Sequence, residues 1–167
     1  MKKRIVTGLI ILLYAIAIVV GVKIFQVMSK TPIPNDIKKN ISFMVFYPDH
    51  KKTGYSLVQD SFKYNPDSKV LLFNADSADN QLVITEQATP DPFNDIPQYW
   101  PSFTSELNSY TEFDSSDGKV ALTRPAELKG GQSAVFNGKG TLMFIHPKKD
   151  LSDDEWRKLF NNLKIIK

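Results

Sequence analysis

The amino-acid sequence predicts an α+β fold: an N-terminal transmembrane helix, then a mostly antiparallel sheet with a short mid-chain helix and a C-terminal amphipathic helix packed on it. Three observations support this prediction. The chain begins with one long apolar run, its later apolar segments are short and rich in β-branched and aromatic residues, and it ends in a well-marked amphipathic segment. Strand follows strand with only a short helix between, unlike the regular alternation of a doubly wound fold.

The first element is the apolar run from Ile5 to Val22, which carries no charged residue. As a helix this run spans about 27 Å, close to the thickness of the bilayer core, and the segment up to residue 27 can extend it. No small-x-small cleavage site follows, so an uncleaved anchor is expected instead of a signal peptide. Residues 1–28 are therefore predicted to form a cytoplasmic tail and an anchor that contacts the lipid bilayer through residues 5–27.

Charge is divided unevenly along the chain. The whole sequence has 21 Lys and Arg against 18 Asp and Glu, but residues 1–30 hold five of the bases and no acid. The rest of the chain therefore has 16 bases (21 − 5) and 18 acids, a net charge of −2. The dense positive charge of the short N-terminal tail predicts a single-pass protein of the cell membrane with a cytoplasmic N-terminus. The remainder, a linker over 29–40 and a domain over 41–167, is then extracytoplasmic.

The strands of this domain are expected at 41–48, 54–62, 68–75, 80–88, 118–125 and in two halves of 133–147. The connector "DSADN" between 68–75 and 80–88 is rich in turn formers and predicts a hairpin. Within 133–147, the dipeptide Asn137-Gly138 predicts a type I′ hairpin turn, because both residues tolerate positive φ.

Two helices are expected in the domain. Phe103, Leu107 and Tyr110 share one face of a short helix over 102–110. The C-terminal segment "LSDDEWRKLFNNLKIIK" has a capping box of Ser152 and Glu155. Its apolar stripe should pack on the sheet; the stripe consists of Trp156, Leu159, Phe160 and Leu163.

The candidate binding segment is "TPDPFNDIPQYWPSF", residues 89–103, which combines four prolines with four aromatic rings. The prolines make it stiff and disfavour both ladder strand and helix. One interpretation is a loop that covers an open end of the sheet. The other is an aromatic rim that stacks on a ligand; its candidate residues are Phe93, Tyr99 and Trp100, with Asp95 or Gln98 orienting a polar group.

No motif predicts a cofactor, a metal or a catalytic site. The segment "NGKGT" lacks the spacing of a phosphate-binding loop, and "DSSDG" lacks the distal acid of a calcium loop. His50 and His146 lie at the ends of strand-like runs, where solvated histidines are the simpler interpretation. The absence of cysteine excludes disulfides and thiolate catalysis. Without clustered cations, the domain is not expected to bind nucleic acid.

The layout resembles small bacterial envelope proteins of unknown function, with a basic tail, one anchor, a Pro-containing linker and an α+β domain. The run "AVFNGKGTLMFIHPKKDLSDDEWRKLFNNLKII" is similar to the endings of small extracytoplasmic domains of the oxygen-evolution-accessory and lipoprotein-carrier kinds. This resemblance covers the last third of the chain and implies a fold and no functional residue.

The function predicted from these observations is a non-catalytic binding, sensing or assembly module of the bacterial envelope, with envelope proteins or glycans as its partners. One alternative is an envelope hydrolase, which predicts a polar pocket where His50 or His146 meets acids. The other is a structural subunit whose anchor drives assembly, although Gly8 and Gly21 are too far apart for a GxxxG dimer face.

Overall fold

The computed structural model describes residues 32–124 and 131–166. The chain divides into two compact units, Met1–Ile33 and Pro34–Lys167, and the fold below is that of the second unit. None of the helices among the described residues has the length and apolarity to cross a membrane. The anchor predicted over residues 5–27 lies outside the described residues.

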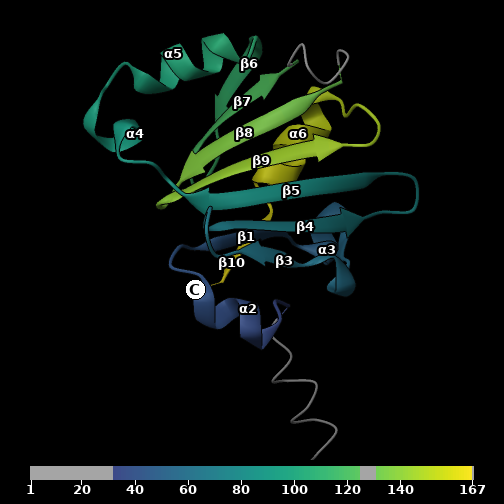
Figure 1. Cartoon of the computed structure of the whole chain (residues 1–167). Coiled ribbons are helices and arrows are strands. Elements are labelled where there is room, and N and C mark those ends of the chain that lie inside the picture. The colour runs from purple at the N-terminus through teal and green to yellow at the C-terminus, as the bar shows by residue number, and fades with distance from the viewer. Residues whose placement is uncertain (1–31, 125–130, 167) are drawn as a thin grey trace, which may run out of the picture. The chain divides into compact units, whose positions relative to one another are not determined.

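The second unit is built on a large antiparallel sheet, as the sequence predicts (Figure 1). Its strand order is β2-β4-β5-β9-β8-β7-β6, and β3 also pairs with β4. Every pairing is antiparallel, and the hairpin predicted around "DSADN" is the β4–β5 pair. The strands are β2 (Ser56–Leu57), β3 (Lys63–Asn65), β4 (Val70–Asp76), β5 (Gln81–Ala88), β6 (Ser109–Asp114), β7 (Lys119–Thr123), β8 (Ser133–Gly138) and β9 (Thr141–Pro147).

The helices of the second unit are short. The structure has α2 (Asn35–Asn40), α3 (His50–Thr53), α4 (Pro92–Asp95), α5 (Tyr99–Glu106) and α6 (Asp153–Phe160), with a 3-10 turn η1 (Gln59–Ser61). Helix α2 forms within the segment that the sequence suggested as a linker. The fold of the described residues is therefore mixed α/β, with a mostly antiparallel sheet and few helices.

One side of the sheet, the back face, is fully covered. Helix α6 lies behind β8 and β9 in Figure 1, and its Phe160 stacks on Phe136 of β8 with ring centroids 5.9 Å apart. The two-stranded sheet of β1 (Val45–Pro48) and β10 (Leu163–Ile166) packs on the same face, where Phe46 meets Phe136 edge-on at 4.8 Å. Side chains between these layers are almost completely shielded from solvent; they include Phe46, Leu71, Phe73, Ile84, Phe136, Ile145, Trp156 and Phe160.

The small sheet is attached to the large one by two buried polar contacts. The backbone N–H of Phe46 donates to both carboxylate oxygens of Glu86, at 3.0 and 3.3 Å. The hydroxyl of Thr141 donates to the carbonyl of Met44 at 2.6 Å. Burial raises the pKa of Glu86 well above its ordinary value, and the hydrogen bond from Phe46 opposes this only in part. The buried environment of Glu86 therefore favours its protonated form.

The capping box of the last helix forms as the sequence predicts, but the helix is shorter than expected. The Ser152 hydroxyl accepts from the Glu155 N–H, and the Glu155 carboxylate accepts from the Ser152 N–H. Helix α6 ends at Phe160, and Leu163 lies in β10, opposite Pro48. The prediction that Leu163 continues the helical stripe was wrong, because pairing with β1 satisfies the backbone of the last residues better than further helix would.

The hairpin predicted within 133–147 exists, but its turn lies two residues further on. Gly138 pairs with Thr141, so Lys139 and Gly140 form the turn, with φ of 47° and 78°. Position 138 requires glycine because of close contacts and not because of the turn. A Cβ there would lie 2.6 Å from the Phe136 ring and against the carbonyl oxygen of Asp117. The Asn-Gly dipeptide thus marks a close backbone approach and not the turn itself.

The proline-rich segment folds differently from the prediction. It contains the single helical turn α4 and the first residues of α5, which begins at Tyr99. Pro92 and Pro101 lie within the first turns of these helices, where the missing N–H costs no hydrogen bond. The helix predicted over 102–110 therefore starts three residues earlier, and Tyr110 belongs to strand β6.

Candidate functional site

The second side of the sheet, the front face, is only partly covered. Strand registers place Leu72 opposite Thr85 and Thr85 opposite Phe144, which puts all three side chains on this face. The same pairings add Asn74, Val83, Gln87 and His146. All seven side chains are half-buried, whereas the alternating residues on the back face, such as Phe73 and Ile84, are fully buried. The front face over β4, β5 and β9 is therefore open to solvent.

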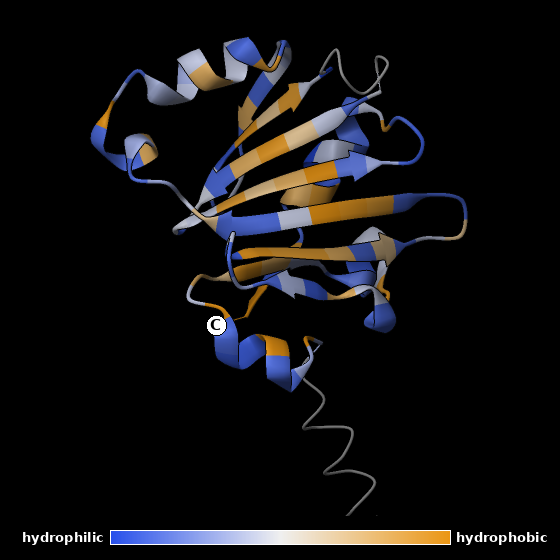
Figure 2. Cartoon of the chain, in the orientation of Figure 1, coloured by the Kyte–Doolittle hydropathy of each residue, from blue (hydrophilic) through white to orange (hydrophobic). Residues whose placement is uncertain are grey.

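Helices α4 and α5 cover the remaining part of the front face, over β7 to β9. Trp100 is the centre of this layer and packs on Ala121, Val135 and Leu142. Phe93, Phe103, Leu107 and Phe144 surround it as half-buried neighbours. Figure 2 shows hydrophobic stretches along β8 and β9, as well as along parts of β4 and β5. The proline-rich segment thus closes one end of the sheet, as the structural interpretation of the sequence expected.

The edge strand β6 holds Trp100 in place. The indole Nε1 donates to Oε2 of Glu112 at 3.2 Å, and the hydroxyl of Thr104 donates to Oε1 of Glu112 at 2.7 Å. A shallow hollow of about 320 Å³ opens beside this contact, with Asp114 and Lys119 in its wall. Only 7% of the Trp100 surface is exposed, so this hollow is where a ligand could reach its ring.

Four aromatic rings continue from Trp100 toward the open part of the face. The ring of Phe93 meets Tyr99 edge-on at 4.7 Å and Phe103 edge-on at 5.1 Å. Phe103 in turn contacts Phe144 of β9 at 6.3 Å. These rings are half-buried, so each keeps part of its surface accessible, and Phe144 lies opposite Thr85 of β5.

The structure brings together three of the five residues suggested by the sequence. Phe93, Tyr99 and Trp100 are mutual neighbours, with Phe93 and Trp100 centroids 6.3 Å apart. Asp95, the last residue of α4, and Gln98, which precedes α5, are exposed, and no hydrogen bond ties either side chain to these rings. A role for all five in binding stays a prediction.

The polar residues of the open part have unused hydrogen-bonding capacity. Among the described residues, no hydrogen bond involves the side chains of Asn74, Thr85 or Gln87. None of the three is charged, and they alternate with Leu72, Val83 and Phe144. No local pattern in the sequence singled out this surface. Alternation along 68–75 and 80–88 could have grouped its residues, but not shown which face of the sheet stays open.

Neither histidine meets an acid in the part of the chain that is described. The Nδ1 of His146 lies 2.6 Å from the hydroxyl of Ser133, and that of His50 lies 2.9 Å from the hydroxyl of Ser56. Ser133 is 1% exposed, which leaves its hydroxyl no room to attack a substrate. Burial lowers the pKa of His146 and favours its neutral form. Within the described ranges, no three His, Asp or Glu side chains gather in a way that could hold a metal ion.

No family model, curated protein or solved structure matches this chain.

Proposed function

We propose that the chain is a membrane-anchored binding module of the bacterial envelope, whose ligand lies on the open front face of the sheet. The anchor is residues 5–27, and the folded domain lies outside the cytoplasm. The ligand class that fits the surface best is an uncharged, hydroxyl-rich molecule such as an envelope glycan. The module binds and does not catalyse.

The observation that carries this proposal is the asymmetry between the two faces. The back face is sealed by α6 and by the β1–β10 pair, while over β4, β5 and β9 the front face carries half-buried side chains. A sheet with no further role would bury its apolar residues on one face and expose polar ones on the other. Here Val83 and Phe144 remain half-exposed on the face that the helices leave open.

The chemistry of this surface favours a carbohydrate. Aromatic rings stack on the apolar faces of sugars, and Phe103 and Phe144 offer such faces at the border of α5. Side-chain amides both donate and accept hydrogen bonds, which matches paired hydroxyls. Asn74 and Gln87 supply these amides on the neighbouring strands. The strand registers also place Asp76 and Lys63 on this face, one acid and one base, so the face carries no cluster of like charge that would favour ionic lipid heads or nucleic acids.

The hydrolase alternative has less support. It required His50 or His146 beside an acid, and each of these rings instead contacts a serine. The structural-subunit alternative depends on the anchor, and replacing residues 5–27 by an unrelated span would test it.

The experiment is a titration of the isotope-labelled full chain in detergent with chitohexaose, followed by amide NMR. The proposal expects saturable shifts at Asn74, Thr85, Gln87 and Phe144. The double variant Asn74→Ala/Gln87→Ala should weaken binding about tenfold or more, because it removes two hydrogen-bonding amides.

The matched control is Asn161→Ala, which removes an exposed amide at the end of α6, behind the sheet. It should leave binding unchanged. Shifts confined to other surfaces, or equal affinity of the double variant, would contradict the proposal.

A further inference from the structure

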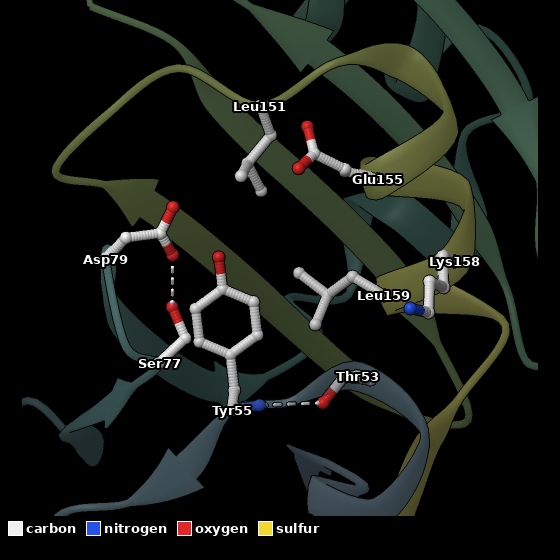
Figure 3. Close-up of a pocket in the computed structure, with 8 residues that line it drawn as sticks. All are labelled: Thr53, Tyr55, Ser77, Asp79, Leu151, Glu155, Lys158 and Leu159. Atoms are coloured by element: carbon white, nitrogen blue, oxygen red, sulfur yellow. Dashed lines mark hydrogen bonds between the residues drawn. The ribbon is translucent and has the colours of Figure 1, made fainter.

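A second cavity lies on the back of the domain, away from the surface proposed for the glycan. It has a volume of about 160 Å³ and lies between α6 and the turn that joins β4 to β5. Figure 3 shows the ring of Tyr55 rising into it, with Leu151 and Leu159 as apolar walls. Three charged residues complete the lining: Asp79, Glu155 and Lys158. For comparison, an engineered cavity of about 150 Å³ accepts benzene, a molecule of six heavy atoms.

Both acidic residues are exposed, and each carboxylate accepts a hydrogen bond from a nearby serine. In the β4–β5 turn, the Ser77 hydroxyl donates to Oδ1 of Asp79 at 3.3 Å, and the Ser77 N–H closes the turn on Asn80 at 2.8 Å. At the start of α6, Oε2 of Glu155 accepts from both the N–H and the hydroxyl of Ser152, at 2.8 and 2.7 Å. Both of these bonds from Ser152 end on the same carboxylate oxygen. The other oxygen of Glu155 remains an acceptor for a ligand.

Tyr55 lines the cavity together with Asp79 and Glu155. Its side chain comes from the segment before β2 and is 8% exposed. Burial is the main cause that raises the pKa of its hydroxyl; hydrogen bonds to Ser77 and Asn80 lower this pKa, while the nearby charges of Glu155 and Asp79 raise it further. In Figure 3 the hydroxyl points into the space between Asp79 and Leu151. The phenol is thus an oxygen ligand at the centre of the pocket, beside two negative groups.

The lining has an excess of one negative charge. Asp79 and Glu155 contribute two carboxylates against the single ammonium of Lys158, and hydrogen bonds from Ser152 lower the pKa of Glu155. Figure 3 shows Asp79 and Lys158 on opposite sides of the cavity, so the side near Asp79 is the more negative. An anionic guest would be repelled there. A hard metal cation needs about six oxygen ligands, and two carboxylates supply too few.

We propose that this cavity binds a small primary amine. The ammonium group lies between the carboxylates of Asp79 and Glu155 and within reach of the Tyr55 hydroxyl. Its short alkyl chain packs on the Tyr55 ring, Leu151 and Leu159. An alkylammonium of five or six heavy atoms matches both the volume and the charge. This site is separate from the front face and does not depend on the proposed glycan ligand.

The test is a titration of the labelled full chain with n-butylammonium chloride, followed by amide and tyrosine-ring NMR. The proposal expects saturable shifts at Tyr55, Ser77 and Asp79. The double variant Asp79→Asn/Glu155→Gln should weaken binding several-fold, because it removes both negative charges of the lining. Glutamine keeps the capping box, so this variant removes charge and not the helix start.

Two further variants make the test specific. Lys158→Met should tighten binding, because it removes the cation that repels an ammonium; a merely structural role for Lys158 would not change the affinity in this direction. Asp153→Asn, an exposed acid in the first turn of α6 outside the cavity, should leave the affinity unchanged.

Three results would overturn the proposal. They are shifts by succinate or calcium chloride that equal those of the amine, an undiminished affinity in the double variant, and an absence of saturable shifts around Tyr55.

Discussion

The indole Nε1 of Trp100 donates a 3.2 Å hydrogen bond to Oε2 of Glu112, and this contact joins α5 to the edge strand β6. The other carboxylate oxygen of Glu112 accepts from the Thr104 hydroxyl, one turn along the same helix. One surface carboxylate therefore fixes the helix that covers part of the front face, and with it the aromatic rings that border the open part.

Replacing this carboxylate should loosen α5. Glu112→Ala removes both acceptors and is expected to cost about 1–2 kcal/mol in the free energy of unfolding, because hydrogen bonds to charged groups exceed the usual contribution. Urea unfolding measures this cost, and a red shift of Trp100 emission should accompany it. The matched variant Glu106→Ala removes an exposed acid at the end of α5 and should change stability by less than about 0.5 kcal/mol. Equal costs for the two variants would show that the Trp100–Glu112 contact is not what holds the helix.

The two glycines of the β8–β9 hairpin should differ in their response to alanine. Gly140→Ala places a Cβ in open space but at a φ of 78°, which costs about 1–2 kcal/mol. Gly138→Ala forces the Cβ against Phe136 and the backbone of Asp117, so its cost should exceed that of Gly140→Ala. Thermal unfolding of both variants gives the order, and a smaller cost for Gly138→Ala than for Gly140→Ala would contradict the close backbone approach at Gly138.

Glu86 makes the stability of the domain depend on pH. Burial raises its pKa in the folded state, so the unfolded chain loses this proton at a lower pH than the folded one. The contribution of Glu86 to stability is therefore complete below the ordinary carboxyl pKa and declines as the pH rises toward the folded-state pKa. Glu86→Gln cannot ionise and keeps an acceptor for the Phe46 N–H.

The stability of Glu86→Gln relative to the natural chain should therefore rise as the pH increases above the ordinary carboxyl pKa. Urea unfolding at a series of pH values measures this difference. A difference that stays constant over the range would mean that Glu86 is ionised in the folded domain.

Local signals in the sequence predicted the parts of the fold that local chemistry decides. The capping box at Ser152 and Glu155 and the hairpin between β4 and β5 depend on neighbouring residues, and both formed as expected. The prediction that Leu163 belongs to the last helix was wrong because this residue pairs with β1, which lies more than a hundred residues earlier in the chain. The prediction that Tyr110 belongs to the mid-chain helix was wrong for a similar reason. Pairing of β6 with β7 outweighed the helical spacing of Phe103, Leu107 and Tyr110.

The candidate sites also include residues that the sequence indicated and residues that only the fold brings together. The aromatic segment around Tyr99 and Trp100 was visible in the sequence, because prolines and rings are dense there. The front-face amides and the cavity beside Tyr55 were not visible in the sequence. Tyr55, Asp79 and Glu155 come from three separate segments, and only the packing of α6 against the β4–β5 turn brings them together.

A ligand of the cell envelope can reach the front face only if the domain lies outside the cytoplasm. The most direct test of the proposed function is therefore the protease accessibility of residues 31–167 in intact spheroplasts, with lysed cells as the control. The account predicts digestion in intact spheroplasts. Digestion only after lysis would place the domain in the cytoplasm and contradict the envelope function.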